Sequence, residues 1–387
     1  MRTMNKSNFK KISKKALWLH KKTHGKFSIQ SKIPVRGSGD LQLVYTPGVG
    51  AVSSFLAKHP KEAKNYTMKR NSVAVVSDGS AVLGLGNIGP EAALPVMEGK
   101  CILFKKFANI DAVPIVLATQ DIDEIVRTIK IIAPAFGGIN LEDISAPRCF
   151  AIEKRLKKEL QIPVMHDDQH GTAIIILAGL LNALKVVDKK LAEVRIVISG
   201  AGAAGTAITK ILLKEGAKKI IVCDSKGILS SLRKNLSWEK KELANLTNRK
   251  KIVGNLARAM QGADVFIGVS APGIVSKSMV RSMAKNSVVF ALANPIPEIM
   301  PDKARRAGAK VIATGRSDFS NQLNNSQVFP GVFRGALDNN IRQITDKMKQ
   351  GVAHAIAGLV PYPTTNSIVP GMFDPRLVKA VAKEMYD

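Results

Sequence analysis

Val194-Arg195-Ile196-Val197-Ile198, followed by Ser199-Gly200-Ala201-Gly202-Ala203-Ala204-Gly205, is the stretch that decides the fold of the second half of this chain. The apolar run predicts a buried strand, and the residues Thr206–Leu213 predict an apolar helix after the turn. A second strand is expected over Lys219–Cys223. Strand, glycine-rich turn, helix and strand in this order are typical of an α/β unit with a parallel sheet.

The turn itself indicates what this unit binds. Gly200, Gly202 and Gly205 are spaced to allow a tight turn, the close approach of a pyrophosphate and close helix packing. Asp224 follows about twenty residues later, where a dinucleotide-binding unit places its ribose acceptor. We therefore expect NAD as the cofactor. NADP stays possible because Lys226 can meet a 2′-phosphate.

Two further strands, Ala263–Val269 and Ser287–Leu292, each end in a loop. Ligands of an open parallel sheet bind at such carboxyl ends, so Asn294 is expected on the nicotinamide side. An ordinary Asn-Pro turn has the same geometry. A short strand is expected over Val311–Ala313, and helices over Arg334–Leu359 and Pro375–Lys383 are expected to close the domain. The predicted cofactor-binding residues are Gly200, Gly202, Ala203, Ala204, Gly205, Asp224 and Asn294.

Two adjacent carboxylates, Asp167 and Asp168, lie between His166 and His170, just before the apolar run Ala173–Leu184. No Lys or Arg occurs between Leu160 and Leu184. Adjacent carboxylates repel each other, and a divalent metal supplies the compensating charge. The alternative is a polar N-terminal cap of the helix.

A second acidic pair, Glu142-Asp143, favours the metal over the cap. It follows Phe136–Asn140, a predicted strand or turn, and no basic residue lies between Lys130 and Arg148. Hard divalent cations take carboxylate oxygens, so Mg²⁺ or Mn²⁺ is expected, completed by water and substrate. Zinc on His166 and His170 is the rival, although no partner set accompanies these histidines.

Lys100 stands alone, because no other basic residue occurs from Asn71 to Gly99 and Cys101-Ile102-Leu103-Phe104 follows it. A lysine in apolar surroundings loses its proton more easily and can act as a base near neutral pH. The alternative is a lysine whose stem packs while its head reaches water.

The first half is also expected to contain further strands and helices. Strands are expected over Ser72–Val76 and Val113–Ala118, and helices over Lys14–Lys22 and Ile122–Ile132. Leu41–Gly50 is predicted to be a short extended run that ends in a Pro-Gly turn. Tyr45 then lies at a strand end, where an ordinary packing tyrosine is the alternative to a catalytic one.

Gly84–Gly89 contains a second GxGxxG string. Pro90 follows it immediately, and the acidic residue expected at the end of a second strand is missing. We expect a tightly packed loop here and no nucleotide site.

Length and composition limit the class of protein. The 387 residues suggest two domains, which we place at 1–162 and 163–387. Three cysteines without CxxC spacing predict a reducing compartment and no disulfide framework. The best membrane candidate, Ala173–Leu184, is too short, and no signal peptide pattern is present. A cytoplasmic protein without a membrane span is expected.

The formal charge of +28 is unusual, and eleven Lys and Arg precede Asp40, the first acidic residue. Such a block can bind nucleic acid or acidic lipid. The later basic pairs, such as Lys189-Lys190 and Lys250-Lys251, have no interleaved aromatic residues for base stacking. Specific nucleic-acid binding is therefore not expected, and the charge also attracts a dianionic substrate.

Taken together, the ordered motifs resemble the malic enzymes, specifically the short prokaryotic type. The resemblance runs from about Ala16 to the C-terminus. The motifs that carry it are Tyr45-Thr46-Pro47-Gly48, Ser77-Asp78-Gly79-Ser80 with Leu83 to Pro90, Glu98-Gly99-Lys100, Leu141-Glu142-Asp143, His166-Asp167-Asp168 with Gly171-Thr172-Ala173, Gly200 to Gly205, and Asn324-Asn325 with Phe329-Pro330-Gly331.

The resemblance implies an N-terminal α/β malic-enzyme domain, a C-terminal Rossmann-type domain and a homodimer. It implies oxidative decarboxylation of malate to pyruvate and CO₂ with NAD or NADP and with Mg²⁺ or Mn²⁺. By position, Lys100 would be the general base and Tyr45 the general acid that protonates C3, with Asp167 tuning Lys100. The metal would lie on Glu142, Asp143 and Asp168, and the malate carboxylate on Asn294 and Asn325.

Three features differ from relatives. Ser80-Ala81 stands where larger eukaryotic enzymes have a substrate-binding arginine, so another group must meet that carboxylate. His170 replaces an amide common in those relatives, and we expect it to support the site without binding the metal. The length leaves no room for the phosphotransacetylase-like extension of some bacterial members.

Two alternatives stay open from the residues. One is a hydroxy-acid or amino-acid dehydrogenase that does not decarboxylate, which the two acidic pairs disfavour. The other is a basic, nucleic-acid-associated protein with an inactive dinucleotide fold.

Overall fold

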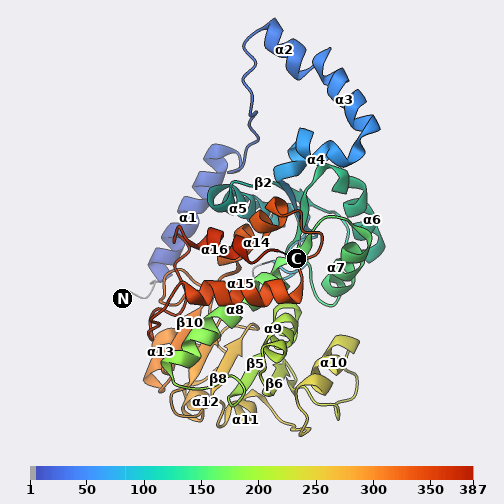
Figure 1. Cartoon of the computed structure of the whole chain (residues 1–387). Coiled ribbons are helices and arrows are strands. Elements are labelled where there is room, and N and C mark those ends of the chain that lie inside the picture. The colour runs from blue at the N-terminus through green and yellow to red at the C-terminus, as the bar shows by residue number, and fades with distance from the viewer. Residues whose placement is uncertain (1–5, 83, 387) are drawn as a thin grey trace.

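The computed structural model describes residues 6–82 and 84–386, and its strands form two sheets, one in each half of the chain (Figure 1). The N-terminal sheet is wholly parallel, with the order β2-β1-β3-β4. Its strands are β1 (Ser72–Ser77), β2 (Asp111–Val116), β3 (Gly138–Leu141) and β4 (Val164–His166). Because β4 pairs with β3, this sheet extends beyond residue 162, where we expected the first domain to end.

Helices cover both faces of the N-terminal sheet, which explains why β1 is apolar without alternation. Val73 and Val75 belong to the same core as Phe104 of α5 (Pro90–Ala108). Ala74 and Val76 face the opposite core, which contains residues of α6 (Ile122–Ile132) and α7 (Arg148–Glu159). The predicted helix Ile122–Ile132 is confirmed; Asp121 caps it by accepting from the backbone N–H groups of Asp123 and Glu124.

The C-terminal sheet has the order β10-β9-β8-β5-β6-β7, and only β7 runs antiparallel. Its strands are β5 (Arg195–Ser199), β6 (Lys219–Asp224), β7 (Gly227–Ile228), β8 (Val265–Gly268), β9 (Val288–Ala291) and β10 (Val311–Thr314). The strand order reverses at β5, which lies between β8 and β6. Such a switch point is where an open α/β sheet binds its ligand. The predicted strands of this half are confirmed, as is the helix after the turn, α9 (Ala203–Lys214).

The long helix α8 (Asp167–Val186) connects the two sheets. By length and composition alone it is apolar enough to cross a membrane, but 72% of its most apolar window is buried inside the protein. The helix is longer than the apolar run Ala173–Leu184 on which the expectation of no membrane span was based, because it begins at Asp167. Its burial between α9 and α15 (Asp346–Gly358) is that of a core helix.

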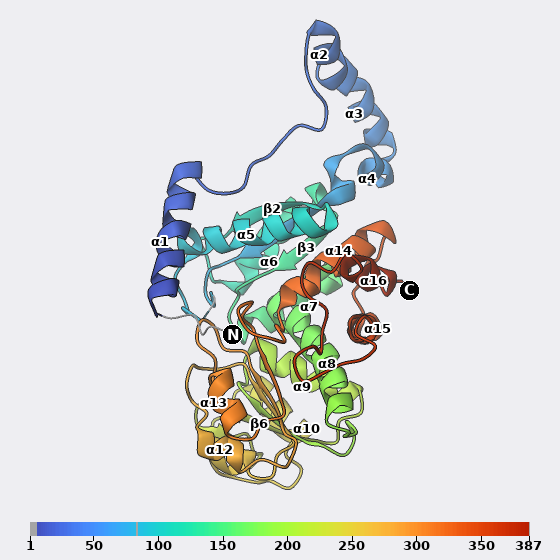
Figure 2. The same ribbon diagram turned by 90° about the vertical axis from the view of Figure 1, so that its left-hand side faces the viewer.

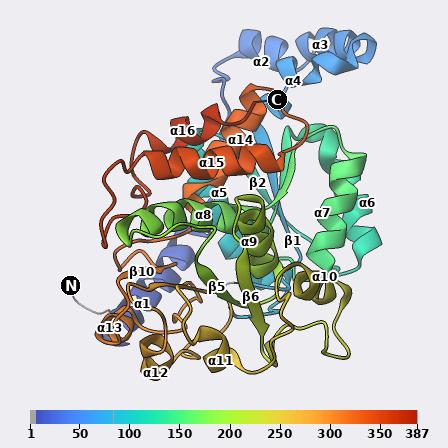
Figure 3. The same cartoon turned by 60° about the horizontal axis from the view of Figure 1, so that its bottom comes forward.

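The C-terminal helices do not form the single long helix expected over Arg334–Leu359. They are α14 (Phe329–Asp338), α15 and α16 (Leu377–Lys383), and α14 is separated from α15 by a turn in which Asn340 has a positive φ of 55°. Figure 3 shows them as a layer beside α5 and α8. Phe329 and Phe333 of α14 pack on Phe104 of α5, with ring centroids 4.6 and 5.5 Å away. The end of the chain thus returns to the N-terminal sheet.

The N-terminal segment was predicted wrongly over Leu41–Gly50. It forms α2 (Ser38–Val44) and α3 (Gly48–Lys58), with Tyr45 at the C-terminal cap of α2. An isolated extended segment has no strand to pair with, whereas a helix satisfies its backbone groups internally. Figures 1 and 2 show α2 and α3 as an arm that stands clear of both sheets, and none of its residues is buried.

The remaining elements are short or peripheral. The helix predicted at Lys14–Lys22 is part of α1 (Lys6–Thr23), which lies along one side of the molecule (Figure 2). The others are η1 (Pro60–Glu62), α4 (Ala63–Tyr66), η2 (Met68–Asn71), η3 (Ala133–Ala135), α10 (Trp238–Leu246), α11 (Leu256–Met260), α12 (Lys277–Arg281), α13 (Pro301–Arg306) and η4 (Asn325–Gln327).

Candidate active site

Four carboxylates meet at the carboxyl edge of the N-terminal sheet. Glu142 and Asp143 follow β3, and Asp167 and Asp168 follow its neighbour β4. One oxygen from each of Glu142, Asp143 and Asp168 lies within 4.8 Å of the others. The Asp143 N–H donates to Asp168 Oδ2 at 2.8 Å. Parallel neighbouring strands thus bring together two acidic pairs that are far apart in sequence.

Lys100 extends from α5 into this cluster and is only 6% exposed. Its ammonium contacts the Asp167 carboxylate and lies 2.5 Å from Glu142 Oε2. It also lies 4.4 Å from the centre of the Phe329 ring. Burial alone favours the neutral amine, but Asp167, Glu142 and Asp168 outweigh it and raise the pKa of Lys100. The alternative of a lysine head in water is wrong, because the head is buried.

Asp167 is fully buried, and burial raises its pKa to about 6 despite the ammonium of Lys100. Gly171, one turn along α8, leaves room for it: a Cβ there would lie 1.9 Å from Asp167 Oδ1 and 3.1 Å from the Asn325 Cβ. Asn325 at the start of η4 therefore packs beside Asp167.

The donor set fits a hard divalent cation. Glu142, Asp143 and Asp168 offer only carboxylate oxygens, the ligands that Mg²⁺ and Mn²⁺ prefer. Burial raises the pKa of Glu142 well above its usual range, and Asp168, Asp167 and Asp143 add to this because like charges repel. A cation among these groups would relieve both effects.

The two histidines do not form the rival zinc site in the described part of the chain. His170 Nε2 lies 2.9 Å from Glu153 Oε2, and His166 Nε2 lies 3.5 Å from Asp168 Oδ2. Glu153, which the sequence did not single out, is buried and also accepts from the His166 backbone N–H at 3.0 Å. Burial lowers the pKa of His170 to about 4. His170 thus helps to fix the start of α8 through its contact with Glu153.

The glycine turn after β5 has the tight turn and the close helix packing that its spacing predicts. Gly200 has φ 117°, and a Cβ on it would lie 2.5 Å from the Val269 carbonyl oxygen. A Cβ on Gly205 would lie 1.8 Å from the Gly200 carbonyl oxygen, whereas Gly202 has nothing within 4 Å. No side chain caps the start of α9, where Ala203 and Ala204 form the first turn. The open side at Gly202 and the uncapped helix end suit a pyrophosphate.

Asp224 lies at the end of β6 as expected, but its carboxylate is already engaged. Arg233 and Lys240 both form ion pairs with it, at 2.9 and 3.0 Å. Neither cation was predicted, because both reach Asp224 from the segment after β7 and no local spacing connects them to it.

Asn294 lies in the loop after β9, and the N-terminal half of the chain touches it there. A Cβ on Gly84 would lie 2.3 Å from the Asn294 carbonyl oxygen. The Gly84 segment thus packs against the second sheet, as the expectation of a tightly packed loop requires. Glu298 fixes the same loop, accepting from the N–H groups of Ser270 at 2.9 Å and Ala293 at 3.0 Å.

A half-buried ion pair that the sequence did not suggest lies near the acidic cluster. Arg148 Nη2 is 3.0 Å from Asp78 Oδ2, and Asp78 is 1% exposed. Ser80 Oγ accepts from the Ser145 N–H at 2.9 Å, which joins the loop after β1 to the loop after β3. The Nε of Arg148 is buried and has no hydrogen-bond partner among the described residues.

Tyr45 is the predicted site residue that this fold does not bring to the cluster. Its side chain is 65% exposed on the arm of α2 and α3. The structure therefore brings Lys100, Asp167 and Asn325 to the acidic cluster, and leaves Tyr45 outside.

A buried lysine among carboxylates at one sheet, with a glycine-lined turn at the switch point of the other, defines a two-domain α/β oxidoreductase. The chain matches the family described as "Malic enzyme, N-terminal domain" over residues 24–157 and "Malic enzyme, NAD binding domain" over residues 169–383. The chain belongs to the malic enzyme family.

Individual relatives agree with this assignment. The chain is 53% identical over 375 residues to the bifunctional malic/malolactic enzyme of Bacillus subtilis (strain 168), which covers 96% of this chain and 92% of the relative. It is 55% identical over 367 residues to the NAD-dependent malic enzyme of Geobacillus stearothermophilus, at 94% and 76% coverage. The crystal structure of an NAD-dependent malic enzyme from Thermotoga maritima has a TM-score of 0.92 and 46% identity, at 96% and 98% coverage. Other relatives are NADP-dependent malic enzymes.

Proposed function

We propose that this chain converts L-malate to pyruvate and CO₂ while reducing NAD or NADP. The observation that carries the reaction is the buried ammonium of Lys100, held between Glu142 and Asp167 beside three carboxylates suited to a metal. Family membership supports the same reaction. It disfavours the non-decarboxylating dehydrogenase and the nucleic-acid-associated protein.

Two bound groups supply chemistry that amino acids lack. We propose that Glu142, Asp143 and Asp168 hold Mg²⁺ or Mn²⁺, and that the turn from Gly200 to Gly205 holds the dinucleotide. When bound, the nicotinamide accepts a hydride and the cation stabilises negative charge on the substrate oxygens. Asn294 and Asn325 are the proposed ligands of the malate carboxylate.

Lys100 is the proposed general base that takes the proton from the C2 hydroxyl of malate. In the described structure its neighbours favour the charged ammonium, so it can take a proton only after part of that negative charge is neutralised. Occupation of the acidic site by a divalent cation would do this. Asp167 then has a positioning role, because it contacts the ammonium and is too deeply buried to reach solvent.

Tyr45 is the proposed acid that protonates C3 after CO₂ has left. Its distance from the cluster within one chain requires a partner, and we propose that the arm of a second copy delivers it. The arm is built for contact: Leu43 is 76% exposed and Tyr45 65% exposed, and no residue of α2 or α3 is buried. The functional unit is then a homodimer with shared sites.

Arg148 is the proposed replacement for the substrate arginine of the larger relatives. The position after the Asp78-Gly79 turn carries Ser80-Ala81 in this chain, and Arg148 brings its guanidinium to that same turn from α7. The start of α7 also faces the dinucleotide half, since the ring centroids of Phe150 and of Trp238 in α10 lie 6.2 Å apart. The buried Nε of Arg148 has no hydrogen-bond partner among the described residues. Its guanidinium is therefore suited to bind a carboxylate of the substrate.

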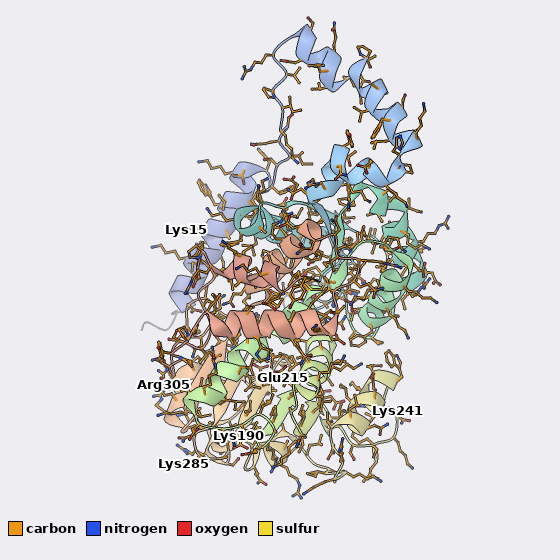
Figure 4. All side chains as sticks on the ribbon, in the orientation of Figure 1. Lys15, Lys190, Glu215, Lys241, Lys285 and Arg305 are labelled. Atoms are coloured by element: carbon orange, nitrogen blue, oxygen red, sulfur yellow. The ribbon has the colours of Figure 1, made fainter. Side chains whose placement is uncertain are left out.

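We place the domain junction at the start of α8, so that β4 stays with the sheet to which it is hydrogen bonded. A cytoplasmic location and the lack of specific nucleic-acid binding rest on composition. Basic side chains such as Lys15, Lys190, Lys285 and Arg305 project from the surface (Figure 4).

The reaction is tested with the purified chain, malate, Mn²⁺ and either dinucleotide, by measuring CO₂, pyruvate and reduced dinucleotide together. Equal amounts of all three are expected. Accumulation of oxaloacetate without CO₂ would support the non-decarboxylating dehydrogenase instead.

A further inference from the structure

The adenosine end of the dinucleotide site holds more positive charge than the motif alone suggests. Asp224, at the end of β6, has a side chain that is 6% exposed. Arg233 donates to both of its oxygens, from Nη1 at 2.9 Å and from Nη2 at 3.1 Å. Lys240 donates to Oδ2 at 3.0 Å, and the Lys226 backbone N–H donates to Oδ1 at 2.9 Å.

These four donors use the full acceptor capacity of one carboxylate, which has about four lone-pair sites. Asp224 cannot then accept the hydroxyl groups of a ribose without losing one of its present partners. Burial works against the charged form of Asp224, but Arg233 and Lys240 outweigh it and lower the pKa to about 2. The carboxylate is therefore fully ionised at neutral pH and committed to its cations.

The charge balance of the cluster favours an anion. Asp224 contributes one negative charge against the two positive charges of Arg233 and Lys240, and the exposed Lys226 is next but one in sequence. Both cations have access to the surface, since their side chains are 21% and 32% exposed. Arg233 and Lys240 can thus contact a bound anion while the cluster keeps Asp224 neutralised.

We infer that Arg233 and Lys240 form a subsite for the 2′-phosphate of NADP, and that Asp224 holds these two cations in place and does not serve as the ribose acceptor. The chain then binds NADP more tightly than NAD. A dianionic phosphate beside two cations gains charge-assisted hydrogen bonds that a ribose hydroxyl cannot make. This inference rests on dinucleotide binding at the Gly200 to Gly205 turn, and it does not depend on turnover of malate.

The test is the binding of two fragments to the full-length protein by isothermal titration calorimetry at constant ionic strength. 2′,5′-ADP carries the extra phosphate and 5′-AMP lacks it. We expect the first to bind about tenfold more tightly, the effect of one good charged contact. Lys240→Gln and Arg233→Gln should each reduce this preference several-fold and leave 5′-AMP affinity unchanged.

Lys241→Gln is the matched control, because Lys241 is a neighbouring, exposed lysine on the same helix (Figure 4). It should leave the preference unchanged, and a loss as large as that of Lys240→Gln would mean unspecific attraction and overturn the subsite. Arg233 also donates to the carbonyl oxygens of Gly227 and Ile228, so its variant is checked by thermal unfolding. Lys240→Gln removes only the contact with the Asp224 carboxylate that the described structure shows, and its thermal unfolding is measured in the same way.

Asp224→Asn separates the two possible roles of the carboxylate. If Asp224 only holds the cations, the variant should bind 5′-AMP as the parent does. A tenfold loss of 5′-AMP affinity would show that Asp224 accepts the ribose and would overturn the inference. Equal binding of both fragments by the parent also overturns it, whereas binding of neither would contradict the dinucleotide site itself.

Discussion

The ammonium of Lys100 and the carboxylate of Glu142 lie 2.5 Å apart in the interior, with side chains that are 5% and 7% exposed. Glu142 is thus shared between a cation that the chain supplies and one that it is proposed to bind. A metal ion bound to Glu142 would neutralise part of its negative charge, and this would lower the pKa of Lys100. The proposed base and the proposed metal are therefore linked through Glu142. Hydride transfer and metal occupancy should therefore depend on each other.

Lys100→Ala should abolish the oxidation of malate, with a loss in kcat of at least about a hundredfold, as expected when a general base is removed. The measurement is pre-steady-state formation of reduced dinucleotide. Lys106→Ala, on an exposed position of the same helix, is the control and should behave as the parent. If Lys100→Ala still oxidises malate at the parental rate, Lys100 is not the base.

Removal of single carboxylates should weaken Mn²⁺ binding by about tenfold or more, because each supplies an oxygen that water replaces poorly. Glu142→Gln, Asp143→Asn and Asp168→Asn are the variants, measured by direct Mn²⁺ titration with electron paramagnetic resonance. Glu124→Gln is a control from the exposed start of α6. Unchanged affinity in all three variants would place the metal elsewhere.

The shared active site makes a prediction that a single-chain site does not. Tyr45→Phe and Lys100→Ala should each be inactive in malate decarboxylation, but a mixed dimer would contain one site with an intact Lys100 and the partner's Tyr45. Random exchange of the two variants should therefore restore about a quarter of the parental activity. A mixture that stays inactive while mixed dimers are present would show that Tyr45 acts within its own chain or not at all.

The sequence predicted the parts of the site that depend on local spacing. The turn at Gly200 to Gly205 was recognised because its conformational demands lie within six residues. The acidic pairs were recognised because adjacent carboxylates stand in stretches without Lys or Arg. Arg148 and Arg233 were missed, because their pairing with Asp78 and Asp224 is set by how distant loops fold together. The arm around Tyr45 was assigned to an extended run that ends in a Pro-Gly turn, since the local sequence does not reveal that no neighbouring strand is available.

Arg148→Gln should raise the KM for malate about tenfold and change the KM for the dinucleotide little, since the lost contact is one charged pair with a carboxylate. Arg148→Lys should recover only part of this, because a lysine cannot make the paired contacts of a guanidinium. Asp78 loses its partner in both variants, so thermal unfolding is measured alongside. Parental kinetics in Arg148→Gln would leave the substrate carboxylate to another group.

Gly205→Ala and Gly202→Ala add the same methyl group to the dinucleotide turn but should change the stability of the protein differently. Gly205→Ala would bring its Cβ to 1.8 Å from the Gly200 carbonyl oxygen, and since backbone must move, a loss of about 1–3 kcal/mol in the free energy of unfolding is expected. Gly202→Ala meets nothing within 4 Å, so its stability should be unchanged.

The binding of 5′-AMP and of the whole dinucleotide separates these variants further. A Cβ on Gly202 would stand where the pyrophosphate approaches the start of α9, so Gly202→Ala should weaken binding of the dinucleotide about tenfold. Binding of 5′-AMP, which has no pyrophosphate, should be affected less. Denaturant unfolding and calorimetry measure the two effects independently. If the two variants are equally stable, the turn tolerates the close contact that a Cβ on Gly205 makes. If Gly202→Ala binds the dinucleotide with parental affinity, the pyrophosphate lies away from this turn.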